Sequence, residues 1–369
     1  MLMLLLEPFA DEHIFFNLFR YHTFRAAGGM ATATFLAFLF GPRTIRWLRQ
    51  LRFGQVVREE GPETHLKKAG TPTMGGLLIL ISTAVATLLW ADVTSEYVWI
   101  TLLVFVWLGV LGFLDDYLKV VRKRSEGLVG RYKLIGQGLI GIIVALILLL
   151  WPPASSVGAT GTSLPFFADI YILIVPLFFI PWVMFIITGS SNAVNLTDGL
   201  DGLAAGLTAI AAVTFGAFAY IVGNRNLSDY LGLFYLPGSE ELAIFCVALG
   251  GATLGFLWFN AHPAEVFMGD TGALALGGAL GAVALLLKQE FLLGIVGGVF
   301  VVEALSVMAQ VGWFKMTARK YGQGRRLLRM APLHHHFEKS GWAESKIIAR
   351  FWILGLLCAL AALATLKIR

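Results

Sequence analysis

Charged side chains are scarce in this sequence. Only 14% of its 369 residues are Asp, Glu, Lys or Arg, and 57% are hydrophobic. A soluble globular domain carries about 25% charged residues. The shortage excludes an ordinary soluble protein and indicates that most of the chain has lipid as its solvent.

Cysteine is nearly absent as well. Cys246 and Cys358 are the two in the chain, and each lies within an apolar run. This scarcity excludes a disulfide framework and a thiolate metal site, and we expect both thiols to be buried in packing contacts.

Leader, repeat and linker features are also missing. The first residues lack a basic region followed by an apolar stretch and a small-residue cleavage site, so we predict no removable signal peptide. The sequence has no repeat of fixed period, no low-complexity tract and no polar segment long enough for a soluble domain. We therefore predict a single integral membrane domain over residues 1–369.

Long apolar runs are what the sequence has in abundance. An α-helix rises 1.5 Å per residue, so about 20 apolar residues cross the hydrocarbon core of a bilayer. Such runs predict an all-α polytopic membrane protein with about ten transmembrane helices, near residues 26–47, 74–91, 97–114, 134–151, 170–189, 199–222, 241–259, 270–287, 290–314 and 345–366.

The cations are distributed unevenly between the connections. Twenty of the 28 Lys and Arg residues lie in three odd-numbered connections, at 43–68, 119–133 and 315–339. By the positive-inside rule these connections are cytoplasmic, and with ten spans both termini face outward. Topology alone explains most of this basicity, and no folded nucleic-acid-binding module accompanies it, so we expect no nucleic-acid partner.

Four polar motifs fall on connections of the same parity. They are "DDYLK" (115–119), "NAVNLTDGLDG" (192–202), "NAHPAEVFMGD" (260–270) and "PLHHHFEKSGW" (332–342). All four therefore open on the predicted cytoplasmic side. We expect them to converge on one site there.

The first motif places Asp115 and Asp116 side by side at the end of an apolar run. On a helix Lys119 is the i+4 neighbour of Asp115, so it is placed to reduce the repulsion between the carboxylates or to contact a phosphate. A helix end solvated by charge is the other interpretation, and the motif alone leaves both open.

The second motif repeats polar side chains at every third position, beside Gly199 and Gly202. Amide and carboxylate oxygens suit a hard divalent cation or the hydroxyl groups of a sugar. The alternative is that one aspartate only caps the next helix, but a cap needs one such residue and this motif has four, Asn192, Asn195, Asp198 and Asp201.

In the third motif Asp270 follows Gly269 at the start of a predicted span, where a lone aspartate is by default a helix cap. Asn260, His262 and Glu265 in the same short loop favour a metal role. Phe267 is suited to stacking on a base, and interfacial anchoring is its alternative role.

The fourth motif has three consecutive histidines, His334 to His336. Zinc needs spaced ligands that converge tetrahedrally, so we expect anion contact or acid–base duty instead. Deeper in the predicted ninth span lie Glu303 and Gln310. Glu303 is a functional candidate or a packing hydrogen bond with equal weight, and we expect Gln310 to contact substrate.

With these motifs in place, the sequence closely resembles the phospho-N-acetylmuramoyl-pentapeptide transferase family, within the polyprenyl-phosphate N-acetylhexosamine-1-phosphate transferase superfamily. The likeness runs through nearly the whole chain, including "FGQVVREEGPETHLKKAGTPTMGG" (53–76), "GLVGRYKLIGQ" (127–137) and "LGFLWFNAHPAEVFMGDTGALALGG" (254–278). "HHHFEKSGW" (334–342) discriminates best, since related transferases that use other sugars have a different histidine pattern there.

The resemblance implies a Mg²⁺-dependent enzyme of the bacterial plasma (inner) membrane, with the active site facing the cytoplasm. Undecaprenyl phosphate would attack UDP-N-acetylmuramoyl-pentapeptide, which gives the first lipid-linked peptidoglycan intermediate and UMP. Both substrates and the surrounding membrane lipid are then the expected partners, and a homodimer stays open. One pyrophosphate bond replaces another, so the exchange needs no ATP.

The resemblance also implies roles for the motif residues. Asp270 would bind Mg²⁺ together with Asn195, and Asp115 would deprotonate or orient the lipid phosphate beside Asp116. The remaining expected substrate contacts are to phosphates (Lys119, Lys133, His334, His335 and His336), to the nucleotide (Lys68 and Thr73), to uridine (Asp198, Gly199, Leu200, Asp201 and Phe267), and to substrate generally (Asn192, Asn260 and Gln310).

Two other functions compete with this one. A sister transferase that uses UDP-N-acetylglucosamine is the nearer rival, and the HHHFE motif argues against it. A polytopic transporter is the rival from another class. Transporters place ionisable groups near the bilayer midplane, whereas the carboxylates here gather at span ends, with Glu303 the main exception.

Overall fold

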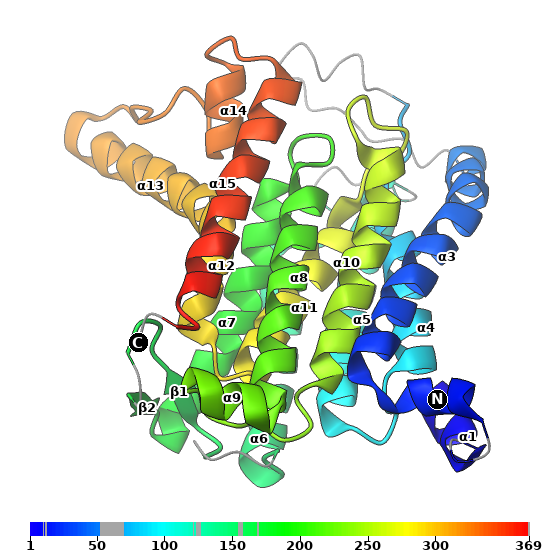
Figure 1. Ribbon diagram of the computed structural model, residues 1–369. Coiled ribbons are helices and arrows are strands. Elements are labelled where there is room, and N and C mark those ends of the chain that lie inside the picture. Colours follow the sequence, from blue (N-terminus) through cyan, green and yellow to red (C-terminus); the bar gives the residue numbers. More distant parts are fainter. Residues whose placement is uncertain are drawn as a thin grey trace.

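The computed structural model describes residues 1–9, 11, 13–51, 70–120, 122, 127–153, 158–167 and 170–367. In this part of the chain the protein is a bundle of long helices (Figure 1). They are α3 (His22–Gln50), α4 (Gly76–Trp90), α5 (Glu96–Val120), α6 (Gly130–Leu150), α7 (Pro176–Thr197), α8 (Leu203–Gly223), α10 (Glu241–Asn260), α11 (Gly269–Leu286), α13 (Gly298–Tyr321) and α15 (Glu344–Ala364).

Short elements connect and flank the long helices. They are α1 (Leu2–Leu6), α2 (Ile14–Asn17), α9 (Arg225–Leu231), α12 (Glu290–Val296), α14 (Leu333–Glu338), two 3-10 helices (Glu7–Phe9 and Leu18–Arg20) and an antiparallel pair of strands, β1 (Gly161–Ser163) and β2 (Tyr171–Leu173). In the strand pair Gly161 faces Leu173 and Ser163 faces Tyr171.

The predicted all-α membrane architecture is confirmed. Within the described ranges, nine helices are long and apolar enough to cross a membrane, and α4 is a shorter apolar helix. Each of the ten predicted runs overlaps at least one helix. Hydrophobic run length is therefore a sufficient guide to these elements.

Two of the predicted boundaries are wrong. The run predicted at 290–314 is two helices, α12 and α13, which are separated at Gly297, where the backbone (φ −86°, ψ 18°) leaves the helical region. Glycine has no side chain to stabilise a continuous helix there. The run predicted from 170 begins in β2, and helix α7 starts only at Pro176, whose fixed φ suits the first helical turn.

Helix α11 lies at the centre of the bundle, with 89% of its residues buried. It packs on α5, α7, α4 and α8. Its sequence, GDTGALALGGALGAVALL, is dominated by small residues, which let neighbouring backbones approach closely in a membrane protein. The residue that begins this helix is thus held by neighbours on every side.

The polar motifs and the chain termini lie at opposite ends of the bundle (Figure 1). The amino group of Met1 donates to the carbonyl of Ala91, just beyond the last residue of α4. At the other end of α4, the Gly76 N–H donates to the Met268 carbonyl at the start of α11. Lys367 contacts the Tyr230 carbonyl of α9, on the same side as the N-terminus.

Candidate active site

The Asp116 carboxylate at the end of α5 caps the first turn of α11. One oxygen accepts from the Asp270 N–H at 3.1 Å. The other accepts from the Thr271 N–H at 2.9 Å and from the Thr271 hydroxyl at 2.7 Å. The first N–H groups of a helix have no partner within the helix, and an anion there also interacts favourably with the helix dipole. Asp116 therefore joins two spans that are distant in sequence.

The turn before Asp270 requires a glycine. Gly269 has φ +72°, in the left-handed region. A Cβ at this position would lie 2.6 Å from an Asp116 carboxylate oxygen and 2.9 Å from the Thr73 hydroxyl. The close contact also places Thr73, a predicted nucleotide-loop residue, beside Asp116.

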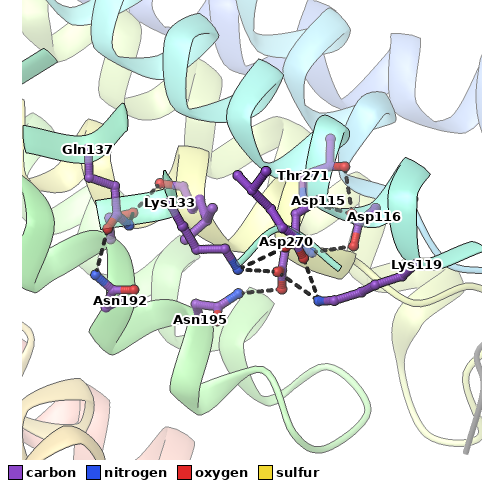
Figure 2. Close-up of polar contacts among 12 residues, drawn as sticks. Asp115, Asp116, Lys119, Lys133, Gln137, Asn192, Asn195, Asp270 and Thr271 are labelled. Carbon is purple, nitrogen blue, oxygen red and sulfur yellow. Dashed lines mark hydrogen bonds and ion pairs between the residues drawn. The ribbon is translucent and has the colours of Figure 1, made fainter. Parts of the chain in front are cut away.

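Asp270 is the centre of the polar contacts in Figure 2. One of its oxygens, Oδ2, lies 2.6 Å from the Lys133 Nζ and 3.0 Å from the Lys119 Nζ. The other, Oδ1, accepts from the Asn195 amide at 2.7 Å. Side chains from α5, α6 and α7 thus meet at the first turn of α11.

Asp115 is 1% exposed and shares both lysines with Asp270. Its Oδ2 lies 2.5 Å from the Lys119 Nζ, so the predicted i,i+4 pairing is confirmed. Its Oδ1 accepts from the Leu128 N–H at 2.9 Å. Burying a charge is costly unless it is paired, and these contacts compensate the cost.

The donor atoms of this group fit a hard cation. Asp115, Asp116 and Asp270 each offer a carboxylate oxygen within 4.8 Å of the others. Three carboxylates face the two lysines, so the group keeps an excess of negative charge. Oxygen-only ligands with this charge suit Mg²⁺. Both oxygens of Asp116 accept hydrogen bonds from α11. The oxygens of Asp270 and Asp115 are contacted mainly by the side chains of Lys119, Lys133 and Asn195, which can move aside for a cation.

The two predicted asparagines of α7 have different surroundings. Asn195 points at Asp270, and rotation of its amide exchanges the nitrogen for an oxygen ligand. Asn192 instead donates to the Gln137 carbonyl oxygen at 3.0 Å, and Gln137 donates to Ser191 at 3.1 Å (Figure 2). Asn192 thereby ties α6 to α7.

Asp198 lies in the turn that follows α7, between two spans. Burial raises the pKa of its carboxyl group to about 8, and the charges of Asp270, Asp116 and Asp201 act in the same direction. The alternative in which an aspartate of this motif caps α8 is wrong, because the capping residue is Gly202, which makes no side-chain cap.

Asp201 belongs to a second polar group. Its Oδ2 lies 3.1 Å from the His262 Nδ1 and accepts from the Ala264 N–H at 3.1 Å. Its backbone N–H donates to Glu344, at the start of α15, at 3.0 Å. His262 also lies 3.5 Å from Glu344, so one imidazole stands between two carboxylates. Three of these side chains have a spacing that would also admit a metal ion.

The loop that carries Phe267 pairs with the segment before α4. The Phe267 N–H donates to the Pro72 carbonyl at 2.8 Å, and the Gly75 N–H donates to the Phe267 carbonyl at 2.9 Å. Asn260 is buried and donates to the Val266 carbonyl at 2.9 Å, which holds the same loop. The Phe267 ring is half-buried.

The three histidines are not equivalent. His334 is fully buried and its Nδ1 lies 3.1 Å from Glu303. The His335 Nδ1 lies 3.0 Å from Glu338. The His336 Nδ1 accepts from the Arg329 N–H at 3.1 Å. A Cβ on Gly199 would lie 2.2 Å from the His334 ring and 3.2 Å from the His335 ring, so two of the three face the turn after α7.

The other predicted site residues are Gln310, Leu200 and Lys68. Gln310 binds the backbone of residues 327 and 328, accepting from both N–H groups and donating to the Leu328 carbonyl. Leu200 is buried in the turn after α7. Lys68 lies outside the described residues, as do Arg52, Arg58, Lys67, Lys123 and Arg124 of the predicted basic loops.

The predicted motifs lie together, but sequence reasoning missed several of their contacts. Thr271, Gln137 and Glu344 all hold predicted site residues. Thr271 directly follows Asp270, so its place at the start of a helix could be recognised in the sequence. Gln137 and Glu344 can be recognised only from the packing of α6 and α15 on their neighbours.

Comparison with known proteins supports the resemblance found in the sequence. The profile of Glycosyl transferase family 4 matches residues 98–288, and phospho-N-acetylmuramoyl-pentapeptide-transferase signature 1 matches residues 68–80. The phospho-N-acetylmuramoyl-pentapeptide-transferases of Gemmatimonas aurantiaca and Citrifermentans bemidjiense are each 54% identical to the chain, and that of Thermodesulfovibrio yellowstonii is 50% identical. Each alignment covers 100% of both sequences.

Proposed function

Since the chain belongs to the phospho-N-acetylmuramoyl-pentapeptide-transferase family, we propose that it transfers phospho-N-acetylmuramoyl-pentapeptide from the UDP-linked precursor to undecaprenyl phosphate. The products are the first lipid-linked peptidoglycan intermediate and UMP. The observation that carries this proposal is the meeting of Asp115, Asp116 and Asp270 with Lys119 and Lys133 at one end of the bundle. Carboxylates for a metal and cations for phosphates are the parts that phosphoryl transfer needs.

The proposed reaction is a single displacement. An oxygen of the lipid phosphate forms a bond to the β-phosphorus of the nucleotide, and the bond from that phosphorus to the bridging oxygen breaks, so that UMP leaves. A phosphate is already a competent nucleophile at neutral pH, so no covalent aspartyl intermediate is required. Isolation of a phosphorylated Asp270 would overturn this route.

Asp115 is the residue we assign to the lipid phosphate. Its carboxylate is held by Leu128, Lys119 and Lys133, which fixes its direction beside Asp270. From there it can orient the attacking phosphate or take its proton. The ammonium groups of the two lysines attract the phosphates of both substrates.

Asp270 and Asn195 are the residues we assign to Mg²⁺, with the oxygens of Asp115 and Asp116 nearby. When bound, the ion would neutralise charge on the diphosphate during transfer. The chain's own part is to hold the ligands in place, and the cap that Asp116 forms on α11 does so directly.

The nucleotide is assigned to the turn after α7 and the loop before α11. Asp198, Gly199, Leu200 and Asp201 form the wall of this pocket, and Phe267 stacks on uracil. Supporting this, the Asp201 carboxylate is fixed by His262 and Ala264, and the Phe267 backbone is fixed by residues 72 and 75. His335 and His334 face the same turn.

We place the protein in the bacterial inner membrane with both termini outside and the site at the cytoplasmic face. The cations support this orientation, since Arg43, Arg46 and Arg49 of α3 and Lys315, Arg319 and Lys320 of α13 lie toward the site end of their helices. A cysteine at Tyr230, which is exposed on α9, should react with an impermeant maleimide in intact cells. A cysteine at Lys339 should react only after lysis, and the reverse pattern would contradict the orientation.

The activity is tested with purified protein in detergent. We expect UMP release that requires Mg²⁺, UDP-N-acetylmuramoyl-pentapeptide and an added polyprenyl phosphate together. Replacing the nucleotide sugar by UDP-N-acetylglucosamine should abolish release. Release with that sugar alone would assign the chain to the sister activity, and no release with either sugar would refute the transferase assignment.

A further inference from the structure

Glu303 is a fully buried carboxylate in a helix that is otherwise mostly exposed. Its side chain is 0% exposed, whereas most residues of α13 are not buried. An isolated ionised carboxylate in an apolar environment costs many kcal/mol, so a buried one must be paired and hydrogen-bonded. Glu303 therefore needs a partner that compensates its charge.

His334 is that partner, through two contacts from one residue. Glu303 Oε1 accepts from the His334 backbone N–H at 3.1 Å, and Oε2 lies 3.1 Å from the ring Nδ1. A carboxylate can only accept, so the hydrogen of the second contact must sit on Nδ1. Glu303 thereby fixes which tautomer His334 adopts, and it holds the ring in one direction.

The other ring nitrogen of His334 points at the turn after α7. Nε2 is buried and, within the described part of the chain, has no hydrogen-bond partner. A Cβ at Gly199 would lie 2.2 Å from it, so the ring can approach this turn only because the residue is glycine. An unpaired buried nitrogen is unfavourable unless a ligand or water completes its hydrogen bond.

The two neighbouring histidines have different hydrogen-bond partners from His334. The His336 Nδ1 accepts a hydrogen bond from a backbone N–H, so its neutral ring carries the hydrogen on Nε2, opposite to His334. The His335 Nδ1 faces Glu338 of its own helix, α14. The His334 contact with Glu303 connects α13 to the predicted nucleotide pocket.

We infer that Glu303 is a positioning residue for the nucleotide. It holds His334 in the form with hydrogen on Nδ1, so that Nε2 faces the Gly199 turn and accepts a hydrogen bond from a hydroxyl or N–H group of the bound nucleotide there. This inference rests on the proposed function and goes beyond it. It gives the buried carboxylate of α13 a role in affinity for the UDP-linked substrate and no role in binding the lipid phosphate.

Glu303→Gln is the direct test. The amide can still accept from the His334 N–H, but its NH₂ group then faces Nδ1, which must give up its hydrogen, and the tautomer reverses. We expect the KM for the UDP-linked substrate to rise about tenfold, the loss of one good hydrogen bond. The KM for the polyprenyl phosphate should not change, and ¹⁵N NMR of histidine-labelled protein should show one ring exchanging Nδ1–H for Nε2–H.

His334→Asn separates positioning from folding. Its amide reaches Glu303 as Nδ1 does, so the buried carboxylate stays paired, but no atom reaches the Gly199 turn. We expect the same rise in KM for the UDP-linked substrate with little change in thermal stability. The double variant should be no worse than either single one, because both remove the same contact.

Glu290→Gln is the matched control, since Glu290 is a buried carboxylate at the far end of the α12–α13 pair and bonds to Thr162. It should leave both KM values unchanged. The inference would be overturned if the effects of the two single variants were additive. It would also be overturned if Glu303→Gln left the KM and the NMR spectrum as in the wild type. If the wild type released no UMP, the proposed function would fail, and the NMR result would still decide whether Glu303 sets the tautomer.

Discussion

The Asp116 carboxylate accepts a hydrogen bond from the backbone N–H of Asp270, 154 positions later in the chain. This contact and the two from Thr271 make Asp116 the cap of α11. The neighbouring Asp115 has no such duty, since it contacts two lysines and the Leu128 N–H. The two adjacent aspartates thus have different partners: Asp116 caps the central helix, and Asp115 contacts the two lysines.

Asp116→Asn should therefore destabilise the fold as well as inactivate it. Three donors converge on the carboxylate, and an amide must turn its NH₂ toward at least one of them. An unsatisfied buried group of this kind costs about 1–3 kcal/mol. We expect a lower Tm in detergent than for the wild type.

Asp115→Asn is the matched comparison. It should abolish UMP release with a smaller loss of Tm, because an amide oxygen can still accept from Leu128 while the NH₂ group faces Lys119, a partly exposed side chain that can turn away as the backbone donors on Asp116 cannot. Equal losses of Tm for the two variants would contradict the division of roles.

Asp270→Asn tests the assignment of the metal. The variant removes the charge that faces Lys119, Lys133 and any bound cation. We expect UMP release to fall about 100-fold, as for removal of one electrostatic contact to the transition state. Excess Mg²⁺ should restore part of it, measured as a rightward shift of the Mg²⁺ titration. Asp229→Asn, on exposed α9, should leave the titration unchanged; a loss at Asp270 that no Mg²⁺ concentration relieves would assign that residue to chemistry instead.

The positions of the spans and the convergence of the four motifs could be predicted from the sequence. Run length and the distribution of cations are local signals, and they are sufficient to put Asp115, Asp198, Asp270 and His334 at one end of the bundle. The pairing of Lys119 with Asp115 was equally readable, because helix periodicity fixes it.

The partners of these residues could not be predicted in the same way. That Asp116 caps α11 depends on α5 and α11 packing together, which no spacing within either helix encodes. The same is true of Glu303, because its partner His334 lies on another helix, α14. The break between α12 and α13 could not be predicted, because Gly297 and Gly298 lie inside an unbroken apolar run.

The Asp198 carboxyl predicts a pH effect on stability. Its pKa in the fold is raised to about 8, chiefly by burial, from an ordinary value near 4 in the unfolded chain. Between these values the folded protein holds a proton that the unfolded chain has released, so the free energy of unfolding should fall as pH rises from about 4 to about 8. In EDTA we expect the Tm to fall over this range in the wild type and to fall less in Asp198→Asn, which cannot ionise. The same slope in both proteins would refute the assignment to Asp198.

Phe267→Ala tests the base-stacking wall of the nucleotide pocket. The backbone of Phe267 pairs with Pro72 and Gly75, so truncating its ring leaves the loop tied to the segment before α4. Stacking on a base contributes about 1–3 kcal/mol, so the KM for the UDP-linked substrate should rise about tenfold or more. The kcat should change much less, because we assign the reacting phosphates to Lys119, Lys133 and the metal that the carboxylates would hold. Phe267→Tyr, which keeps an aromatic face, is the control and should stay near the wild type. If Phe267→Ala lowered kcat and left KM unchanged, the ring would act on the chemistry and the uracil would have to lie elsewhere.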